Sequence, residues 1–191
     1  MKKKIVWFTG LSGSGKTTLA NALISELQKK YKIKKKHIVA IDGDKFRKKN
    51  KKKNIFSKRN IIENNNSIIN YVKKIKSKFN YIIVSVISPL KVTRVSAKKI
   101  FGESYYEVYV HCNLKTLQKR DTKGLYLKAK KNQLKNLIGF NSKIKYETSK
   151  YKTIMINTDK LSKKNSIKKI IKNLKIKYKF ILLFKLLDYF F

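Results

Sequence analysis

The sequence is poor in cysteine, proline and acidic residues. The scarcity of cysteine and of proline each excludes a structural feature. A single cysteine, Cys112, means that no intramolecular disulfide can form. Cys112 falls inside an apolar, strand-like run, which predicts that it serves as a small buried hydrophobe. The single proline excludes a Pro-rich linker between domains.

Long apolar runs are missing as well. No segment reaches the roughly 18 apolar residues that a membrane-spanning helix needs. The first ten residues, MKKKIVWFTG, hold a short apolar run that leads directly into glycine-rich sequence, unlike a secretory signal peptide. We therefore predict a cytoplasmic protein without a transmembrane segment.

Acidic residues are strongly outnumbered: 10 Asp and Glu stand against 49 Lys and Arg, for a formal net charge of +39. Such an excess attracts anionic partners such as nucleotides, nucleic acids or acidic membranes. A second interpretation is compositional, because abundant Lys, Asn and Ile are typical of an AT-rich genome. The lysines are spread from Lys2 to Lys185 rather than gathered on one predicted element, which favours the second interpretation. We expect no nucleic-acid partner.

The chain does have enough apolar sequence for one folded domain, with 42% hydrophobic residues in a length of 191. Runs of strand length, rich in Ile, Val and Tyr, alternate with longer helical patterns. The predicted strands are residues 5–9, 38–41, 81–86, 105–111 and 153–156. This alternation predicts a three-layer α/β fold in which helices cover both faces of a mainly parallel sheet of about five strands.

Two helices can be predicted from their apolar spacing. Residues 16–30 place Leu19, Leu23 and Leu27 on one helical face. The second helix precedes the third strand, and Ser57 is suited to cap its start. Its apolar positions are Ile61, Ile62, Ile68, Ile69, Val72 and Ile75.

The strongest motif is GLSGSGKT at residues 10–17, which fits G-x-x-x-x-G-K-[ST] and joins a predicted strand to a predicted helix. The backbone N–H groups of such a loop, with the positive end of the helix, hold phosphate groups. Lys16 would reach the β- and γ-phosphates of ATP, and the Thr17 hydroxyl would ligate Mg²⁺. The residues predicted to bind the nucleotide are Gly10, Leu11, Ser12, Gly13, Ser14, Gly15, Lys16, Thr17, Thr18 and Arg120.

Two carboxylates, Asp42 and Asp44, follow the second predicted strand, and Arg47 lies one turn further on. The carboxyl ends of parallel strands face the ligand crevice. Carboxylates there can orient Mg²⁺ through its waters and accept a proton from an attacking hydroxyl. Asp42 is the candidate base, Asp44 the alternative, and Arg47 would pair with a phosphate of the acceptor. The competing interpretation is an ordinary Asp–Gly turn.

The long basic stretch 120–146 predicts a lid over the site. Arg120 and Lys123 at its start could close on the phosphates and exclude water, or could simply form a solvated basic surface. We predict a P-loop kinase domain over residues 1–176 and an apolar tail over 177–191. For the tail, a terminal helix packed on the domain or mere coding drift is favoured over a membrane-surface or partner-binding segment.

Several motifs in order together resemble the adenylylsulfate (APS) kinase family over residues 5 to 158. Besides the phosphate loop, they are DGDKFR at 42–47, FS at 56–57 with EN at 63–64, ISPL at 87–90, EVYV at 107–110, RDTKGLYLKA at 120–129 and YE at 146–147.

The resemblance implies ATP- and Mg²⁺-dependent phosphorylation of the 3′-hydroxyl of APS to give PAPS, the activation step of sulfate assimilation. It places Lys16, Asp42 and Asp44 at the reacting centre. Ser88 matches a serine described in the family as a phosphoserine intermediate; because in-line transfer needs no such intermediate, we favour substrate contact. Family members are often dimers. The residues implied to bind the acceptor are Asp44, Arg47, Phe56, Asn64, Ile87, Ser88, Lys123 and Leu137.

All departures from the family pattern lie on the acceptor side. Asn60-Ile61 stands where the family usually has Asp-Arg, residues 65–67 replace Ile-Arg-Arg, and Leu137 replaces a stacking Phe. One interpretation is a diverged APS kinase that compensates with other cations. Another is a sister enzyme for a different nucleotide acceptor, such as cytidine diphosphoramidate in capsule or glycan modification. A third, less favoured, is a basic nucleic-acid-binding P-loop protein.

Overall fold

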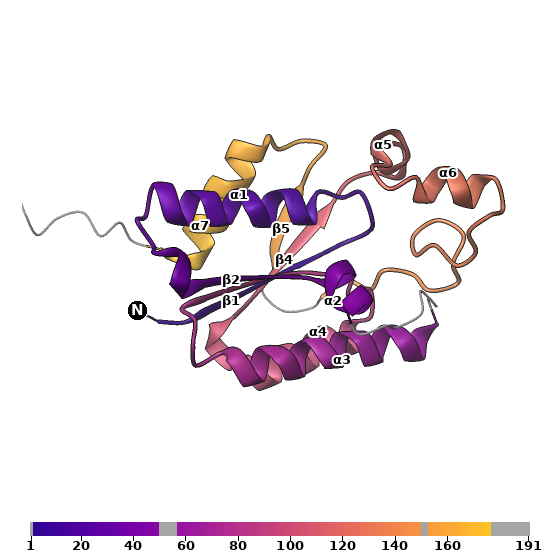
Figure 1. Ribbon diagram of the computed structural model, residues 1–191. Helices are drawn as coiled ribbons and strands as arrows, with labels where there is room; N and C mark the ends of the chain where they lie inside the picture. The colour runs from indigo at the N-terminus through magenta and orange to yellow at the C-terminus, as the bar shows by residue number, and fades with distance from the viewer. Residues whose placement is uncertain (1, 50–56, 150–152, 177–191) are drawn as a thin grey trace, which may run out of the picture.

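The computed structural model describes residues 2–49, 57–149 and 153–176, and these form three layers (Figure 1). The middle layer is a sheet of five parallel strands in the order β2-β3-β1-β4-β5. Its members are β1 (Lys4–Thr9), β2 (Ile38–Asp42), β3 (Tyr81–Ser85), β4 (Tyr105–His111) and β5 (Ile154–Asn157). Each strand lies within one residue of its predicted bounds at either end, so the predicted fold class is confirmed.

Helices cover both faces of this sheet, as Figure 1 shows. One layer holds α1 and α7, and the opposite layer holds α3 and α4. The helices are α1 (Lys16–Lys29), α2 (Gly43–Lys49), α3 (Lys58–Ile75), α4 (Lys91–Phe101), α5 (Leu114–Arg120), α6 (Leu125–Lys130) and α7 (Lys163–Leu174), with 3-10 turns η1 (Lys35–His37) and η2 (Gly102–Ser104).

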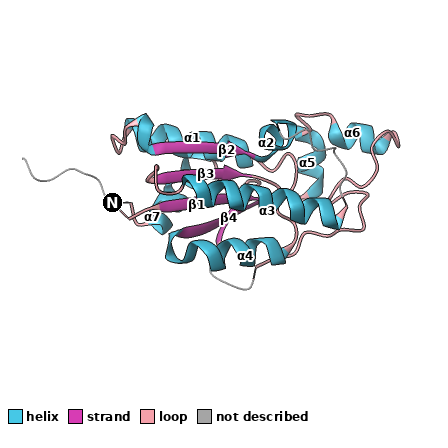
Figure 2. Ribbon diagram, turned by 60° about the horizontal axis from the view of Figure 1, so that its bottom comes forward, coloured by secondary structure: helices cyan, strands magenta, loops and turns pink. Residues whose placement is uncertain are grey.

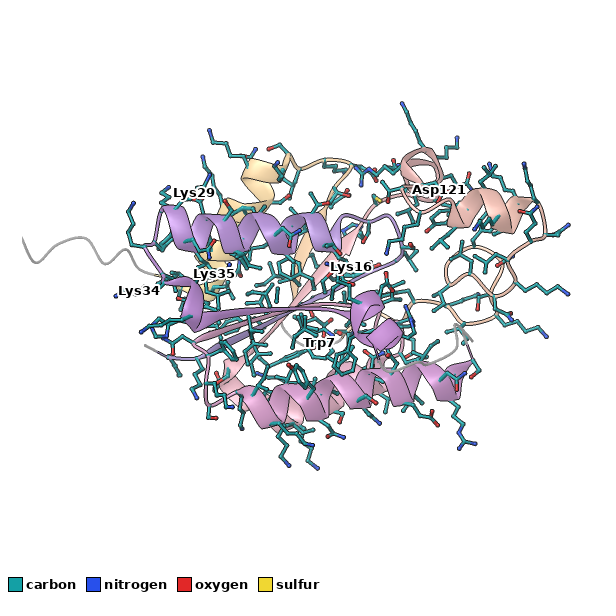
Figure 3. All side chains as sticks on the ribbon, viewed as in Figure 1. Trp7, Lys16, Lys29, Lys34, Lys35 and Asp121 are labelled. Carbon is teal, nitrogen blue, oxygen red and sulfur yellow. The ribbon has the colours of Figure 1, made fainter. Side chains whose placement is uncertain are left out.

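Two apolar cores lie on the two faces of β1, whose six residues are all buried. Under α1, Leu23 and Leu27 are fully buried against the strand residues Val6 and Phe8. Truncating one such leucine to alanine typically costs about 2–5 kcal/mol of stability. On the other face, Trp7 packs among residues of α3 and α4, and Figure 3 shows it on the side of the sheet away from Lys16.

Local signals behave largely as predicted. The Ser57 hydroxyl accepts a hydrogen bond from the Asn60 amide at 3.2 Å and so caps α3. The prediction for Cys112 is wrong in part: Cys112 lies one residue beyond β4 and is only half-buried, because the chain turns there toward α5. The predicted tail at 177–191 lies outside the described residues.

The candidate functional residues lie where the strands end. All five strands run in the same direction, so their carboxyl ends meet at one edge of the sheet. The phosphate loop, α2 and the segments α5 and α6 gather beyond this edge in Figures 1 and 2. Within the described ranges, no helix is both long and apolar enough to cross a bilayer.

Candidate active site

The phosphate loop joins β1 directly to α1. Gly10 has φ 144°, and a Cβ there would lie 2.0 Å from the carbonyl oxygen of Val110, so no side chain fits. Gly15 precedes α1 with φ 98° and provides no side-chain cap. The first N–H groups of α1 are therefore left to an anionic ligand, as in other helix N-terminal phosphate sites.

Lys16 lies buried at the start of α1 with 9% of its surface exposed (Figure 3). Its Nζ donates a hydrogen bond to the Leu11 carbonyl oxygen at 2.7 Å. Burial lowers the pKa of Lys16 to about 8, although the charge of Asp44 opposes this shift. A buried ammonium of this kind gains most from a strongly anionic partner, such as a triphosphate.

Three oxygen-bearing side chains meet beside the loop. The Thr17 hydroxyl donates to Asp42 Oδ2 at 3.2 Å and lies 3.1 Å from the Ser85 hydroxyl. The other carboxylate oxygen of Asp42 accepts the amides of Asp44 at 3.0 Å and Lys45 at 3.1 Å, which fixes the carboxylate at the start of α2. One face of Asp42 is therefore structural, while the other faces the phosphate loop.

Asp44 is held between two cations. Its Oδ1 pairs with Arg47 on the same helix, and its Oδ2 pairs with Lys123 from the predicted lid. Burial works against ionisation of Asp44, but the hydrogen bond and charge of Lys123, with the charges of Arg47 and Lys16, keep its pKa below the ordinary value. Asp44 is thus ionised and is a weaker proton acceptor than an ordinary carboxylate.

These groups line a cavity of about 480 Å³ at the carboxyl edge of the sheet. It is large enough for a nucleotide. Its lining residues are Ser12, Gly13, Ser14, Gly15, Lys16, Thr17, Thr18, Leu19, Asp42, Asp44, Ser85, Val86, Ile87, Arg120, Thr122, Lys123, Thr158, Leu161, Lys163 and Ser166. Most of the predicted phosphate-loop residues and the predicted Arg120, Lys123 and Ile87 are therefore brought together.

The sequence reasoning missed the wall formed after β5. Arg120 donates to the Thr158 hydroxyl at 2.8 Å and to the Thr158 carbonyl at 2.9 Å. The Thr158 hydroxyl in turn donates to the Ser14 carbonyl oxygen at 3.2 Å. A usable signal was available, because Thr158 follows a predicted parallel strand and must lie at the same edge as the phosphate loop.

The predicted lid packs on the phosphate loop. The carboxylate of Asp121 accepts the amides of Tyr126 at 3.1 Å and Leu127 at 2.9 Å, which fixes the start of α6. Tyr126 is buried, and its hydroxyl donates to the Ser12 carbonyl oxygen at 2.9 Å. The segment that carries Lys123 is therefore attached to the phosphate loop.

Ser88 lies one residue beyond Ile87 but does not line the cavity. It is fully buried; its hydroxyl donates to Asn65 Oδ1 and accepts from Trp7 Nε1 at 3.1 Å. The hydroxyl is thus both a hydrogen-bond donor and an acceptor to other side chains inside the protein. This placement is at odds with the predicted contact to substrate, because the hydroxyl faces Trp7 and Asn65 rather than the cavity.

Leu137 also differs from its predicted place. Only 2% of its surface is exposed, and it packs with Leu117, Tyr126 and Ala129 inside the lid rather than against the cavity. Its apolar side chain is removed from water in that cluster.

Of the remaining acceptor residues, Asn64 is buried, and its Oδ1 has no hydrogen-bond partner among residues 2–49, 57–149 and 153–176. A buried amide oxygen without a partner is costly, so Asn64 is suited to a polar ligand group. Phe56 lies outside the described residues.

Comparison with known proteins decides the family. The family model described as Adenylylsulphate kinase matches residues 2–157. The chain belongs to the adenylylsulfate kinase family. It is 36% identical over 157 residues to a probable adenylyl-sulfate kinase of Archaeoglobus fulgidus, covering 82% of this chain and 96% of that one. It is 36% identical over 175 residues to an adenylyl-sulfate kinase of Halothermothrix orenii, covering 90% and 89%.

Solved structures agree with this family. The APS kinase CysC of Mycobacterium tuberculosis, in complex with AMPPNP and APS, matches with a TM-score of 0.78 and 29% identity, covering 92% of this chain and 99% of that one. A gluconokinase of Sinorhizobium meliloti, 14% identical with a TM-score of 0.59 over 91% of each chain, shares the fold alone. The predicted family and the predicted P-loop kinase fold are confirmed.

Proposed function

We propose that this chain transfers the γ-phosphate of ATP to the 3′-hydroxyl of adenylylsulfate, giving PAPS. The observation that carries the proposal is the meeting of Lys16, Thr17, Asp42 and Asp44 in one cavity at the carboxyl edge of the sheet. Membership in the adenylylsulfate kinase family and the relatives named adenylyl-sulfate kinase support the same activity.

On the nucleotide side, the N–H groups of the phosphate loop and Lys16 would hold the phosphates. Lys16 would exchange its hydrogen bond to the Leu11 carbonyl for phosphate oxygens and stabilise charge that develops during transfer. Arg120 and Thr158 would border the remainder of ATP, since both line the cavity beside the start of α1.

The donors in the site also suit Mg²⁺, which prefers oxygen ligands and usually keeps several waters. Thr17 would be a direct ligand, and Asp42 would hold a coordinated water, because their oxygens lie 3.2 Å apart beside the phosphate loop. Bound Mg²⁺ would neutralise charge on the β- and γ-phosphates.

On the acceptor side, Asp42 would orient the 3′-hydroxyl and accept its proton. Asp44 is less suited to that role, because Lys123 and Arg47 hold its carboxylate and lower its pKa. Asp44 would instead fix the two cations, which could then turn toward the acceptor's phosphate. Asn64 and Ile87 would border the acceptor.

One observation supports a different nucleotide as a second candidate acceptor. Ile61, where the family pattern has Arg, is 8% exposed and packs with Leu90 and Ile138. An apolar cluster therefore stands where a cation would contact APS. A cytidine nucleotide such as cytidine diphosphoramidate would require fewer contacts there, and the same Asp42 would serve its ribose hydroxyl.

The remaining predictions belong to the same proposal. They are a kinase domain at 1–176 with a lid at about 120–146, a homodimer, a cytoplasmic location and the absence of a nucleic-acid partner. The family membership favours a small-molecule nucleotide acceptor over the nucleic-acid-binding alternative.

The experiment is product identification. Purified protein, ATP, Mg²⁺ and APS would be incubated, and the product analysed by mass spectrometry and ³¹P NMR for a new 3′-phosphate. We expect PAPS from wild type and none from Lys16→Ala. ATP hydrolysis without PAPS would refute the proposed acceptor, and no ATP consumption with any nucleotide acceptor would refute the kinase assignment.

A further inference from the structure

Arg94 of α4 is among the most deeply buried charged residues described, and the proposed function gives it no role. Its side chain is 0% exposed, and its ion-pair partner Glu107 of β4 is 2% exposed, with Nε and Oε1 3.2 Å apart. Burying two charges is expensive and is often no more stabilising than an apolar pair. The pair therefore calls for an explanation other than stability.

The guanidinium of Arg94 joins β4, through Glu107, to two further segments that are distant in sequence. One Nη group donates to the Ser88 carbonyl oxygen in the loop after β3. The other donates to the carbonyl oxygen of Glu147, directly after the predicted lid. Nε lies within 3.3 Å of the Ser149 hydroxyl, which itself donates to Glu107 at 2.6 Å. We name these contacts the Arg94 clamp.

Further contacts hold the same lid end in place. The ring of Tyr146 lies under the guanidinium at 5.1 Å and stacks on Tyr109 at 4.6 Å. Its hydroxyl is 2.8 Å from the Thr9 hydroxyl, at the last residue before the phosphate loop. The Glu147 carboxylate accepts the Lys91 amide at 2.6 Å and so caps α4.

Both segments that the clamp joins lead into the cavity. Ser88 directly follows Ile87, a lining residue, and the peptide between them is held from the other side by Asn65. The segment ending at Glu147 is continuous with the lid that presents Lys123 to Asp44. Its other end is fixed by Arg120 on Thr158. Arg94 thus connects the far end of the lid to the loop that contains Ile87 and Ser88.

We propose that Arg94 is a positioning residue for phosphoryl transfer: its buried guanidinium fastens the end of the lid to the loop that carries Ile87 into the cavity. Arg94 does not itself line the cavity. The acceptor's hydroxyl and the γ-phosphate are aligned only while both segments keep this relation, and small misplacements can cost about a hundredfold in rate. ATP contacts the other side of the cavity, so its binding should depend little on Arg94.

The test is Arg94→Lys, which keeps one positive charge opposite Glu107 but cannot reach three segments at once. We expect kcat to fall about tenfold to a hundredfold, with a raised KM for the acceptor. The Kd of a nonhydrolysable ATP analogue should stay within about twofold, because the phosphate loop is untouched. The matched control is Lys98→Met, which breaks an exposed ion pair with Glu103 on the same helix and should leave all three constants unchanged.

Hydrogen exchange gives a readout that does not need turnover. In ligand-free protein, the Glu147 amide bonds to the Pro89 carbonyl at 2.8 Å and should exchange faster in Arg94→Lys than in wild type. Should Arg94→Lys not fold, Ser149→Ala removes one lid contact while keeping the buried pair, and smaller changes in the same direction are expected.

This inference rests on the proposed function, but different experimental results would refute each of them. A wild type that phosphorylates no acceptor refutes the proposed function. Unchanged amide exchange at Glu147, or a variant that is merely less stable while kcat and acceptor KM match wild type, overturns the role of Arg94.

Discussion

The two sides of the cavity are built in different ways. The proposed nucleotide side is made largely of one continuous stretch, residues 12–19, whose backbone and Lys16 would supply the phosphate contacts. The proposed acceptor side is assembled from α2, α3, the loop after β3 and the lid, which are far apart in sequence. A contiguous backbone site is specified locally, whereas the acceptor side depends on how distant segments pack and can change without loss of the fold.

The largest expected effect falls on the nucleotide side. Replacing Lys16 by alanine removes the cation that faces the phosphates, and phosphoryl transfer should drop at least about a thousandfold. Steady-state turnover with saturating ATP measures it. Lys29→Ala is the control, since Lys29 is exposed in the last turn of the same helix. Full activity in Lys16→Ala would contradict the assignment.

Asp42 links the two sides, so its replacement comes next. Asp42→Asn keeps the shape but removes the proton acceptor, and kcat should fall about 10²- to 10⁴-fold. ATP binding, measured by titration calorimetry, should change far less. Asp44→Asn is the comparison variant; a larger loss of kcat there than in Asp42→Asn would make Asp44 the base.

A third prediction concerns stability and pH. Burial lowers the pKa of Lys16 to about 8 from its ordinary value of 10.5. Below pH 8 Lys16 is protonated in both the folded and the unfolded chain. Burial of the charged ammonium then destabilises the folded chain to its full extent. Between pH 8 and 10.5 the folded chain loses its proton first, so the cost disappears as pH rises.

Lys16→Met should therefore stabilise the ligand-free protein at pH 7 by up to about 3 kcal/mol. Urea unfolding at pH 7 and pH 10 measures this gain, which should shrink at the higher pH. Lys29→Met controls for the lower net charge. A Lys16→Met protein less stable than wild type at pH 7 would be the contrary result.

The smallest effect on activity is expected at Ser88. Ser88→Ala removes the hydrogen-bond partner of the buried Trp7 Nε1 and Asn65 Oδ1 and should cost about 1–3 kcal/mol of unfolding free energy. Turnover should stay within about tenfold of wild type, because the hydroxyl does not face the cavity. Thr93→Val, which removes another buried hydroxyl, is the stability control. The contrary result would be a Ser88→Ala protein that folds but is inactive, together with phosphate detected on Ser88 of the wild type by mass spectrometry. That result would support the phosphoserine intermediate.

The same contrast explains what the sequence could predict. Alternating apolar runs specify the parallel sheet, and the phosphate loop specifies one side of the cavity, because both signals are local. The placement of Ser88 and Leu137 could not be read in this way, since burial against Trp7 or Tyr126 arises only from tertiary packing. Thr158 could have been found, but only by carrying the strand-end argument through to the fifth strand.

We propose that the nucleotide side is an ordinary ATP site while the altered acceptor side still accepts APS. The most direct measurement is kcat/KM for APS against cytidine diphosphoramidate and other cytidine nucleotides, in one preparation at fixed salt and saturating MgATP. We expect turnover that strongly favours APS. Turnover with a cytidine nucleotide and not with APS would contradict it, and would mean that the changes at Asn60, Ile61 and Leu137 mark a different acceptor.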